Sequence, residues 1–500
     1  MPDCASSLAP ATMIDGAASG LAGRAGRGPF RPEVWLNARQ RSSVRLAVYY
    51  FRAADVAIAA GLALAALWSL GDLDPRTLTL GAVTPLAVGA LAVLILLRGF
   101  GLYRFGPNPA PLIHLACVVL AGGLAAAAAA ALGLALGQGL GPVIPWGVGT
   151  TLVLIALHGL WLTLVARWRR QGALSPNIVI VGATRNAKAL IERALERRDL
   201  NVLGVFDDRL ARSPDSLAGV PVLGAADALL SHRMLPYVDR IILAIDAEAG
   251  PRVRELTRRL ETLPNPLTIL VDSETGRDAV LTRLAGAPLA QIGGGGSPDA
   301  RAFVKRLQDL VIGALALIAA APVMAVIALA IRLDSPGPIF FRQRRHGFNQ
   351  EAIVVWKFRS MRHAAADATA SRQITANDDR VTRVGRFIRA TSLDELPQIF
   401  NVLTGEMSLV GPRPHAIGMK TGETESALLV AEYAHRHRIK PGMTGWAAIK
   451  GSRGPVNTEA EVRRRVELDV DYIQRQSFWL DLWIILITVP VLLGDRAAVR

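Results

Sequence analysis

Residues 303–333, FVKRLQDLVIGALALIAAAPVMAVIALAIRL, form one apolar stretch about long enough to cross a bilayer as a helix, with Pro322 near its middle. Basic side chains flank both of its ends: Arg301, Lys305, Arg306, Arg332, Arg342, Arg344 and Arg345. Basic flanks are typical of the cytosolic side, and one crossing cannot place both ends there. The sequence therefore favours a re-entrant helix, broken at Pro322, that dips into the inner leaflet and returns, over a fifth membrane span.

Four further apolar stretches lie upstream, at 48–70, 79–98, 111–138 and 142–166. Each has about the 20 residues that a membrane-spanning helix needs. Arginines precede the first stretch, lie between the second and third, and follow the fourth. These positions predict a four-helix transmembrane bundle at 46–170 with both ends in the cytosol.

Two histidines, His114 and His158, fall inside these spans. We favour a hydrogen bond within the bundle for them over a functional role. Residues 1–45 are rich in glycine, alanine and arginine and have no apolar core of a cleavable signal. They are expected to form a disordered cytosolic leader.

The composition indicates a membrane protein, since 51% of the 500 residues are hydrophobic. The net charge of +15 suits phosphate-bearing partners or an anionic leaflet. Cys4 lies in the polar leader and Cys117 inside an apolar stretch, so neither a disulfide framework nor a zinc cluster is expected. Nucleic-acid binding is not expected, because the aromatic residues lie mainly in or beside apolar segments rather than along a basic stripe.

Short apolar runs alternate with charged helical segments between 171 and 292, which predicts a Rossmann-like parallel α/β domain. The strand runs are NIVIVGA (177–183), NVLGVFDD (201–208), RIILAID (240–246) and LTILVD (267–272). Only Gly182 remains of a dinucleotide-binding glycine fingerprint, although Asp207 and Asp208 stand where a ribose-binding acid would. We therefore favour a scaffold or regulatory domain over a dinucleotide site, and expect no bound dinucleotide cofactor.

A glycine-rich linker at 293–300 separates this domain from the C-terminal part of the chain, 301–500. That part is expected to hold the re-entrant helix (303–333) and a small α/β catalytic domain. Its last apolar segment, 477–493, is interrupted by Asp481 and Pro490 and is rich in tryptophan, so it is expected to lie at the membrane interface.

The stretch TSLDELPQIFNVLTGEMSLVGPRP (391–414) contains an acidic pair, Asp394 and Glu395. With Ser392 or Asp394 as the cap, the pair lies at a helix N-terminus, where the helix dipole favours ionised carboxylates. A structural cap and a nucleophile or metal ligand would use that position equally well.

Basic residues recur in the turn-rich segments around this pair: Arg342, Arg344, Lys357, Arg359, Arg389, Arg413 and Lys440. Cations around two carboxylates make a coherent site for a diphosphate held with a divalent metal, because phosphoryl transfer depends mainly on positioning and charge neutralisation.

The motifs KFRSM, S-x-DELPQ, N-V-L-x-G-x-MSLVGPRP and KPGMTGWA follow one another between 357 and 447. In this order they resemble the catalytic module of bacterial polyprenyl-phosphate sugar-1-phosphate transferases, and the whole chain from about residue 45 resembles the long form of that family. The resemblance implies transfer of a hexose 1-phosphate from a UDP-sugar to undecaprenyl phosphate at the cytosolic face of the bacterial inner membrane, with release of UMP. It also implies a pathway for exopolysaccharide or capsule, and Mg²⁺ as cofactor.

The resemblance assigns roles by motif. Asp394 would be the nucleophile that forms an aspartyl phosphosugar, and Glu395 its partner in Mg²⁺ binding. Arg413, between Pro412 and Pro414, would bind phosphate, and Lys357 and Arg359 would lie near the nucleotide diphosphate.

The tail 453–473, RGPVNTEAEVRRRVELDVDYI, is similar to that of the glucose 1-phosphate branch of the family. Pro455 and Ala448 depart from that branch, so galactose or an N-acetylated sugar stays open. Two rival functions are weighed: a non-catalytic assembly or regulatory membrane protein with a nucleotide-sensing α/β domain, and a membrane-anchored dehydratase using NAD. The second is disfavoured because the glycine fingerprint is incomplete. Whether the chain forms a homo-oligomer is left open.

Overall fold

The structure is a computed structural model. It describes residues 38–69, 79–103, 110–197, 200–209, 214–230, 232–244, 250–270, 289–291, 298–362, 380–417, 419–421, 424–452, 454, 456 and 458–494. The predicted leader up to residue 37, and residues 293–297 of the predicted linker, lie outside the described residues.

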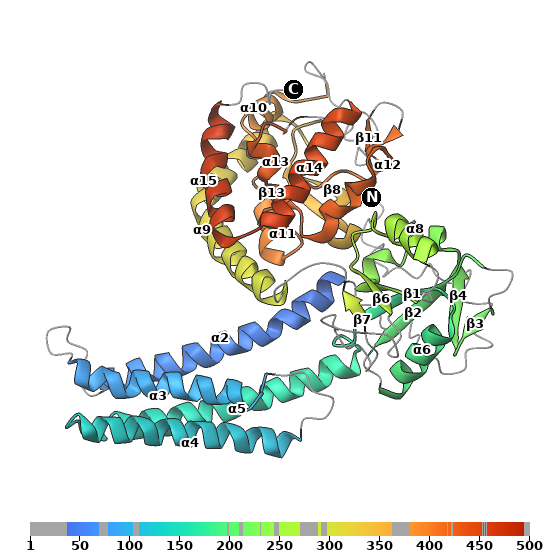
Figure 1. The fold of residues 1–500 in the computed structure, drawn as a ribbon. Helices are drawn as coiled ribbons and strands as arrows, with labels where there is room; N and C mark the ends of the chain where they lie inside the picture. Colours follow the sequence, from blue (N-terminus) through green and yellow to red (C-terminus); the bar gives the residue numbers. More distant parts are fainter. Residues whose placement is uncertain are drawn as a thin grey trace, which may run out of the picture.

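Four apolar helices pack side by side: α2 (Ala38–Ser69), α3 (Leu80–Gly99), α4 (Pro111–Ala135) and α5 (Val143–Arg170) (Figure 1). By length and composition each could cross a membrane. Helix α2 begins at Ala38 and so includes residues that were predicted as disordered leader. The physical reason lies in its arginines, which pair with both of the domains that follow the bundle.

Polar side chains inside the bundle bond to one another, as predicted for its two histidines. His114 Nε2 lies 2.9 Å from His158 Nδ1. On its other side His158 approaches Asp55, which also accepts a hydrogen bond from Tyr103. Buried polar groups need such partners because no water reaches them.

The α/β domain, residues 177–291, has one sheet in the order β3-β4-β2-β1-β5-β6-β7, with parallel central strands and antiparallel edges. Its strands are β1 (Asn177–Val181), β2 (Asn201–Phe206), β3 (Ser216–Leu217), β4 (Val220–Gly224), β5 (Arg240–Leu243), β6 (Leu267–Leu270) and β7 (Leu289–Gln291). Its helices are α6 (Arg185–Arg197), α7 (Ala226–Leu230), η2 (Leu235–Tyr237) and α8 (Gly250–Leu260). Strand β1 is buried along its whole length, because its two faces contribute to two separate cores. The predicted combination of apolar helices with an α/β sheet is confirmed.

Hydrogen bonds within the α/β domain hold the loop after β1 in place. Asp207 Oδ2 accepts a hydrogen bond of 2.7 Å from the amide of Ala183, and Oδ1 accepts one from Arg209. Thr184 caps α6 and donates to the carbonyl of Ala244. In a dinucleotide site this acid would bind ribose and the loop amides would bind phosphate. Here Asp207 bonds to its own loop instead.

The C-terminal domain, residues 298–494, begins with the 37-residue helix α9 (Pro298–Asp334). The predicted break at Pro322 is not confirmed, because α9 continues through it. Proline removes only one backbone hydrogen bond there. The turns that follow are held by packing of Met324, Ile327 and Ile331 on Phe358 and Ile388.

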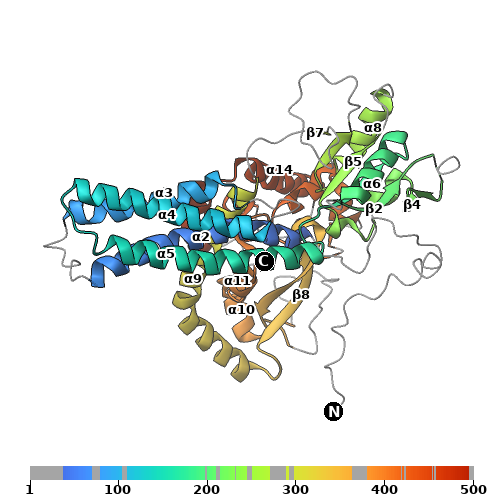
Figure 2. The same ribbon diagram turned by 90° about the horizontal axis from the view of Figure 1, so that it is seen from below.

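The rest of this domain is a compact mixture of short elements beside α9 (Figures 1 and 2). They are β8 (Phe340–His346), η3 (Phe348–Gln350), β9 (Ala352–Phe358), α10 (Arg383–Ala390), η5 (Leu393–Glu395), α11 (Gln398–Thr404), β10 (Ser408–Val410), β11 (Lys420–Thr421), β12 (Thr424–Glu425), α12 (Ser426–Leu429), η6 (Ala431–Arg438), β13 (Gly442–Thr444), α13 (Trp446–Ile449), α14 (Glu459–Arg475) and α15 (Phe478–Gly494). Strands β8 and β9 form a hairpin, and β10 pairs in parallel with β13.

Helix α15 rests on the domain through the acid that interrupts its apolar sequence. Asp481 is buried, accepts a hydrogen bond of 2.6 Å from Tyr472 and pairs with Lys305 of α9 at 2.7 Å. The other face of the helix exposes Trp479 and Leu486. One face therefore faces the protein, and the other is apolar and bare.

Candidate active site

The acidic pair lies in the single 3₁₀ turn η5, directly before α11. Ser392 occupies its N-cap position with a positive φ of 56°, but its side chain makes no capping hydrogen bond to the turn. Ser392 therefore does not cap the turn through its side chain. Pro397 precedes the first residue of α11, where its missing N–H costs no helical hydrogen bond.

Glu395 is held firmly by two cations. Its carboxylate accepts a hydrogen bond of 2.8 Å from Lys357 Nζ and a bidentate pair of 2.5 and 3.2 Å from Arg413. Burial by itself would raise the pKa of the Glu395 carboxyl, but Arg413 and Lys357 hold that pKa well below its ordinary value. Glu395 is therefore ionised and fixed in orientation.

Asp394 differs from its neighbour, because none of the described residues donates a hydrogen bond to it. Burial raises the pKa of Asp394; Lys357 opposes this rise, and the adjacent Glu395 carboxylate adds to it. Arg389, in the last turn of α10, also lies close enough to favour its charged form. The side chain is only partly buried, so it is available to a ligand.

The β8–β9 hairpin supplies the cations on one side of the pair. Lys357 lies opposite Phe341, and Arg345 opposite Ile353, so strand alternation puts both cations on one face. Arg345 donates to the carbonyl of Pro414, and burial lowers its pKa to about 10. The sequence analysis did not place Arg345 in the site. Phe341 pairs with Lys357, and alternate residues of a strand share a face, so Arg345 lies on the same face as Lys357.

Arg342 belongs to the opposite face of the hairpin. Its guanidinium stacks 4.2 Å above the ring centre of Trp356, and it has no described contact with the acidic pair. The structure does not bring this predicted substrate-binding residue into the site.

The Pro-Arg-Pro turn owes its position to two glycines. Gly411 donates to the carbonyl of Thr444, and Gly442 donates to the carbonyl of Pro412 at 2.9 Å. A Cβ on Gly442 would collide with the Gly411 backbone, so the motifs VGPRP and KPGMTG need glycine at this contact. The turn thereby aims Arg413 at Glu395.

A buried arginine that the sequence did not single out supports this turn. Arg436 donates to the carbonyl of Arg413 and pairs with Asp469, at 2.8 Å in each case. It also contacts His415, whose buried ring has a pKa well below its ordinary value. Asp469 belongs to α14, which also bonds the carbonyl of Val410 through Tyr472 at 3.2 Å. The tail motif thus holds both ends of the VGPRP segment.

Two other predicted residues lie elsewhere. Arg359 is buried and donates to carbonyls at the end of α9, including those of Ser335 and Pro336. Lys440 faces Arg306 and Asp309, and burial lowers its pKa to about 8.

The acidic pair could take part in metal binding. The described residues contain no group of three or more His, Cys, Asp or Glu side chains arranged for a metal ion. Mg²⁺, however, is often held by one or two carboxylates together with substrate phosphates. Ionised Glu395 and partly exposed Asp394 fit that arrangement.

Comparisons with known proteins cover most of the chain. A family described as bacterial sugar transferase matches residues 300–495, and one described as CoA-binding domain matches residues 112–270. The UDP-glucose:undecaprenyl-phosphate glucose-1-phosphate transferase of Xanthomonas campestris pv. campestris is 36% identical over 71% of this chain and 74% of its own length. The protein of the same name from Escherichia coli (strain K12) is 34% identical over 69% of this chain and 74% of its own. The exopolysaccharide production protein PSS of Rhizobium leguminosarum bv. phaseoli is 47% identical over 37% of this chain and 93% of its own.

We expect Arg436→Met to destabilise the C-terminal domain, because it leaves Asp469 buried without its closest cation. Breaking a buried ion pair costs roughly 3–5 kcal/mol, which corresponds to about 6–20 °C in a domain of this size. The thermal unfolding midpoint of the detergent-purified protein measures the change. Arg436→Met/Asp469→Leu should recover much of the loss, and Arg463→Met, which breaks an exposed pair with Glu459, should change little. An unchanged midpoint in Arg436→Met would contradict the expectation.

Proposed function

The chain belongs to the bacterial sugar transferase family, and we propose that it transfers glucose 1-phosphate from UDP-glucose to undecaprenyl phosphate, releasing UMP. It is a phosphoglycosyltransferase of the inner membrane, and its product starts the repeat unit of an exopolysaccharide or capsule. The choice of glucose over galactose or an N-acetylated sugar follows the names of the relatives that match most of the chain.

The assignment of roles rests on the different surroundings of Asp394 and Glu395. Both oxygens of Glu395 are engaged by Lys357 and Arg413, whereas Asp394 accepts no hydrogen bond from a described residue. A carboxylate held by two cations is a weaker nucleophile than one without such partners, so Asp394 is the residue that attacks. Glu395 instead fixes the two cations beside it.

The reaction has two displacements at phosphorus. An Asp394 oxygen attacks the phosphorus that bears glucose; the bond from that phosphorus to the bridging oxygen breaks, and its electron pair leaves with UMP. An oxygen of undecaprenyl phosphate then attacks the aspartyl phosphoglucose. The Asp394–phosphorus bond breaks, the carboxylate is restored, and undecaprenyl diphosphate glucose leaves.

The cations stabilise the charge that moves during these steps. Lys357, Arg345 and Arg413 lie close to one another near the pair, and Arg389 approaches Asp394 from α10. Preorganised cations of this kind act strongly where water is partly excluded. They bind the diphosphate and lower the charge repulsion that the anionic Asp394 meets when it attacks.

Mg²⁺ is the proposed cofactor, and Glu395 and Asp394 would hold it together with phosphate oxygens of the substrate. When bound it would neutralise the diphosphate and help UMP leave. Lys357 and Arg413 keep Glu395 ionised and fix the orientation of its carboxylate.

A covalent enzyme intermediate suits these two substrates. UDP-glucose is soluble, whereas the polyprenyl tail confines undecaprenyl phosphate to the bilayer. Storage of the phosphosugar on Asp394 lets each substrate visit the same carboxylate without both being bound together.

The placement of α9 supports a cytosolic, membrane-seated C-terminal domain. Near its start, Arg306 donates to the carbonyls of Val402 and Leu403 at 2.6 and 2.7 Å. At its end, Asp334 accepts from Val384. Both ends therefore contact the same domain, which supports a placement of both on one side of the bilayer. We propose that α9 lies in the inner leaflet and returns to the same side, with Pro322 bending the helix but not breaking it.

The outer face of α9 has the character that this placement requires. Exposed apolar side chains recur along it at helical spacing: Val304, Leu307, Val311, Leu315, Ile318, Val326, Leu329 and Leu333. On α15, Trp479 and Leu486 are exposed in the same way. A continuous bare apolar face is unfavourable in water and favourable in lipid.

The test of the function is UMP release from UDP-glucose by protein in nanodiscs with undecaprenyl phosphate and Mg²⁺. We expect lipid-dependent release by the wild type and none above background by Asp394→Asn. Lys357→Met should lower the rate roughly 100- to 1,000-fold, because it removes one preorganised cation. The exposed, off-site Arg344→Met should keep the wild-type rate. Lipid-dependent release from UDP-galactose alone would contradict glucose, and normal turnover by Asp394→Asn would contradict the nucleophile.

The acid limb of the pH–rate profile should lie above the ordinary aspartate pKa of about 3.9. Asp394 must be ionised to attack; its raised pKa means that activity is lost at a higher pH as the solution is acidified. Glu395→Gln removes the neighbouring negative charge, so the limb of its residual activity should move to lower pH. A limb that does not move in this variant would contradict the coupling of the two acids.

The re-entrant placement can be tested by labelling single cysteines with a membrane-impermeant maleimide, after Cys4 and Cys117 are replaced. Asp299→Cys, at the start of α9, and Arg344→Cys, after its end, should both react in inside-out vesicles and not in spheroplasts. Gly139→Cys, between α4 and α5, should show the reverse pattern. Reaction of the first two from opposite sides would show that α9 crosses the membrane.

A further inference from the structure

The tip of the β8–β9 hairpin is built from two residues with an unusual backbone. Asn349 and Gln350 in η3 have φ values of 53° and 61°. Asparagine tolerates this left-handed region better than most residues. Asn349 is also buried, with 5% of its surface exposed, although it stands at the end of a hairpin. Something outside the hairpin must therefore cover it.

The covering element is the α/β domain. The side-chain amide of Asn349 donates to the carbonyls of Leu235 and Val238, at 2.9 and 3.1 Å, on the segment before β5. Its Oδ1 accepts a hydrogen bond of 2.9 Å from Asn265, which itself also donates to Val238. Every polar atom of the Asn349 side chain is thus engaged by the other domain.

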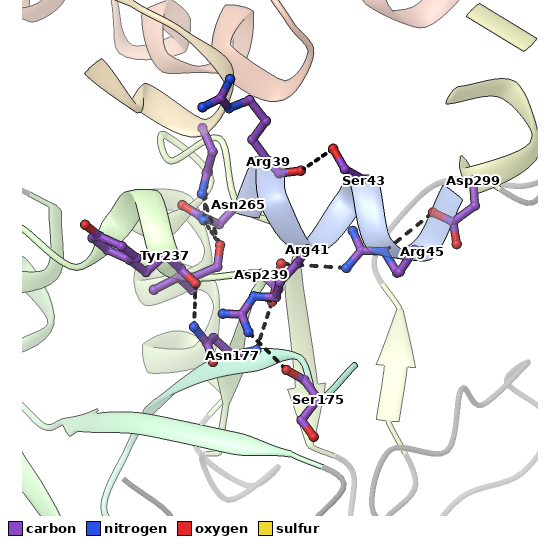
Figure 3. Close-up of polar contacts among 12 residues, drawn as sticks. Arg39, Arg41, Ser43, Arg45, Ser175, Asn177, Tyr237, Asp239, Asn265 and Asp299 are labelled. Atoms are coloured by element: carbon purple, nitrogen blue, oxygen red, sulfur yellow. Dashed lines mark hydrogen bonds and ion pairs between the residues drawn. The ribbon is translucent and has the colours of Figure 1, made fainter. Parts of the chain in front are cut away.

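Helix α2 reinforces the same junction (Figure 3). Arg41, 1% exposed, pairs with Asp239 of the α/β domain at 2.8 Å. Two residues earlier, Arg39 pairs at 3.1 Å with Glu351, the residue that follows the hairpin tip. The start of α2 therefore connects the α/β domain to the hairpin tip, directly before β9 begins.

The hairpin also serves the active site. Arg345, opposite Ile353, lies next to the tip, and Lys357, opposite Phe341, lies at the open end; their partners are Pro414 and Glu395. Within the described residues β8 and β9 form a sheet of only two strands. A two-stranded sheet is marginally stable by itself, so its geometry depends on what holds it.

We propose that Asn349 is a positioning residue through which the α/β domain holds the hairpin, and thereby Lys357 and Arg345, in place for the reaction. This inference rests on the proposed function. It gives a role to a domain whose loop after β1 is closed by Asp207. Asn349 acts through the backbone of the hairpin, and this role needs no ligand in the α/β domain.

The neighbouring residue provides a matched control. Asn349→Gly keeps a backbone that favours positive φ and deletes the amide, whereas Gln350→Gly changes a similar backbone and deletes no described hydrogen bond to the α/β domain. A second contact between the domains, from His435 to the carbonyl of Glu261, remains in both variants. Loss of the amide is therefore not expected to separate the domains.

The experiment measures UMP release and hydrogen exchange of residues 340–358 in the full chain in nanodiscs. Asn349→Gly should lower kcat/KM for UDP-glucose about 5- to 30-fold, the equivalent of one or two hydrogen bonds, and should speed hairpin exchange. Gln350→Gly should leave both near wild type. Asn265→Ala should act in the same direction, and its effect should not add to that of Asn349→Gly, because the two side chains form one network.

Three outcomes would overturn the inference: no change in Asn349→Gly, an equal change in Gln350→Gly, or faster exchange with unchanged kcat/KM. The last would mean that the contact holds the hairpin but does not serve the reaction. Absence of UMP release from the wild type would contradict the proposed function instead, and the exchange rates would still report whether Asn349 anchors the hairpin.

Discussion

The carboxylate of Glu395 joins the three segments that make the site. Lys357 reaches it from the hairpin, Arg413 reaches it from the Pro-Arg-Pro turn, and its own 3₁₀ turn carries Asp394 beside it. A buried carboxylate is costly unless cations pair with it, and buried cations carry the same penalty. Each segment therefore needs the other two. Asp394 accepts no hydrogen bond from a described residue, because Lys357 and Arg413 both donate to its neighbour.

The membrane and the site are connected through α9. Its protein-facing side carries polar groups that bond the domain, such as Arg306, which holds carbonyls of α11, and Asp309, which holds Ser408 and Leu409 of β10 at 3.0 Å. Its other side is apolar and bare. The same helix can thus rest in lipid and position β10, the strand that leads into the Pro-Arg-Pro turn. This arrangement suits a reaction between a soluble and a lipid substrate.

The α/β domain has a sheet with parallel central strands, and several of its polar groups bond within the chain. Asp207 bonds its own loop, and Asp239 neutralises Arg41 at the start of α2. The carbonyls at its edge receive the amide of Asn349. Its described polar contacts therefore support neighbouring parts of the chain.

The sequence by itself determined the parts that depend on local pattern and composition. Apolar runs of spanning length, the strand runs of the α/β domain, and an acidic pair among basic motifs could all be read from it, since each is a property of neighbouring residues. Only the tertiary structure decided which cations reach that pair. Arg345 enters and Arg342 does not, because strand pairing sends adjacent residues to opposite faces. Arg359 and Lys440 are engaged by α9 and its surroundings, and Arg436 acts through a backbone carbonyl distant in sequence. Pro322 was expected to break α9, but long-range packing on Phe358 and Ile388 holds the helix together, and no local signal carries that information.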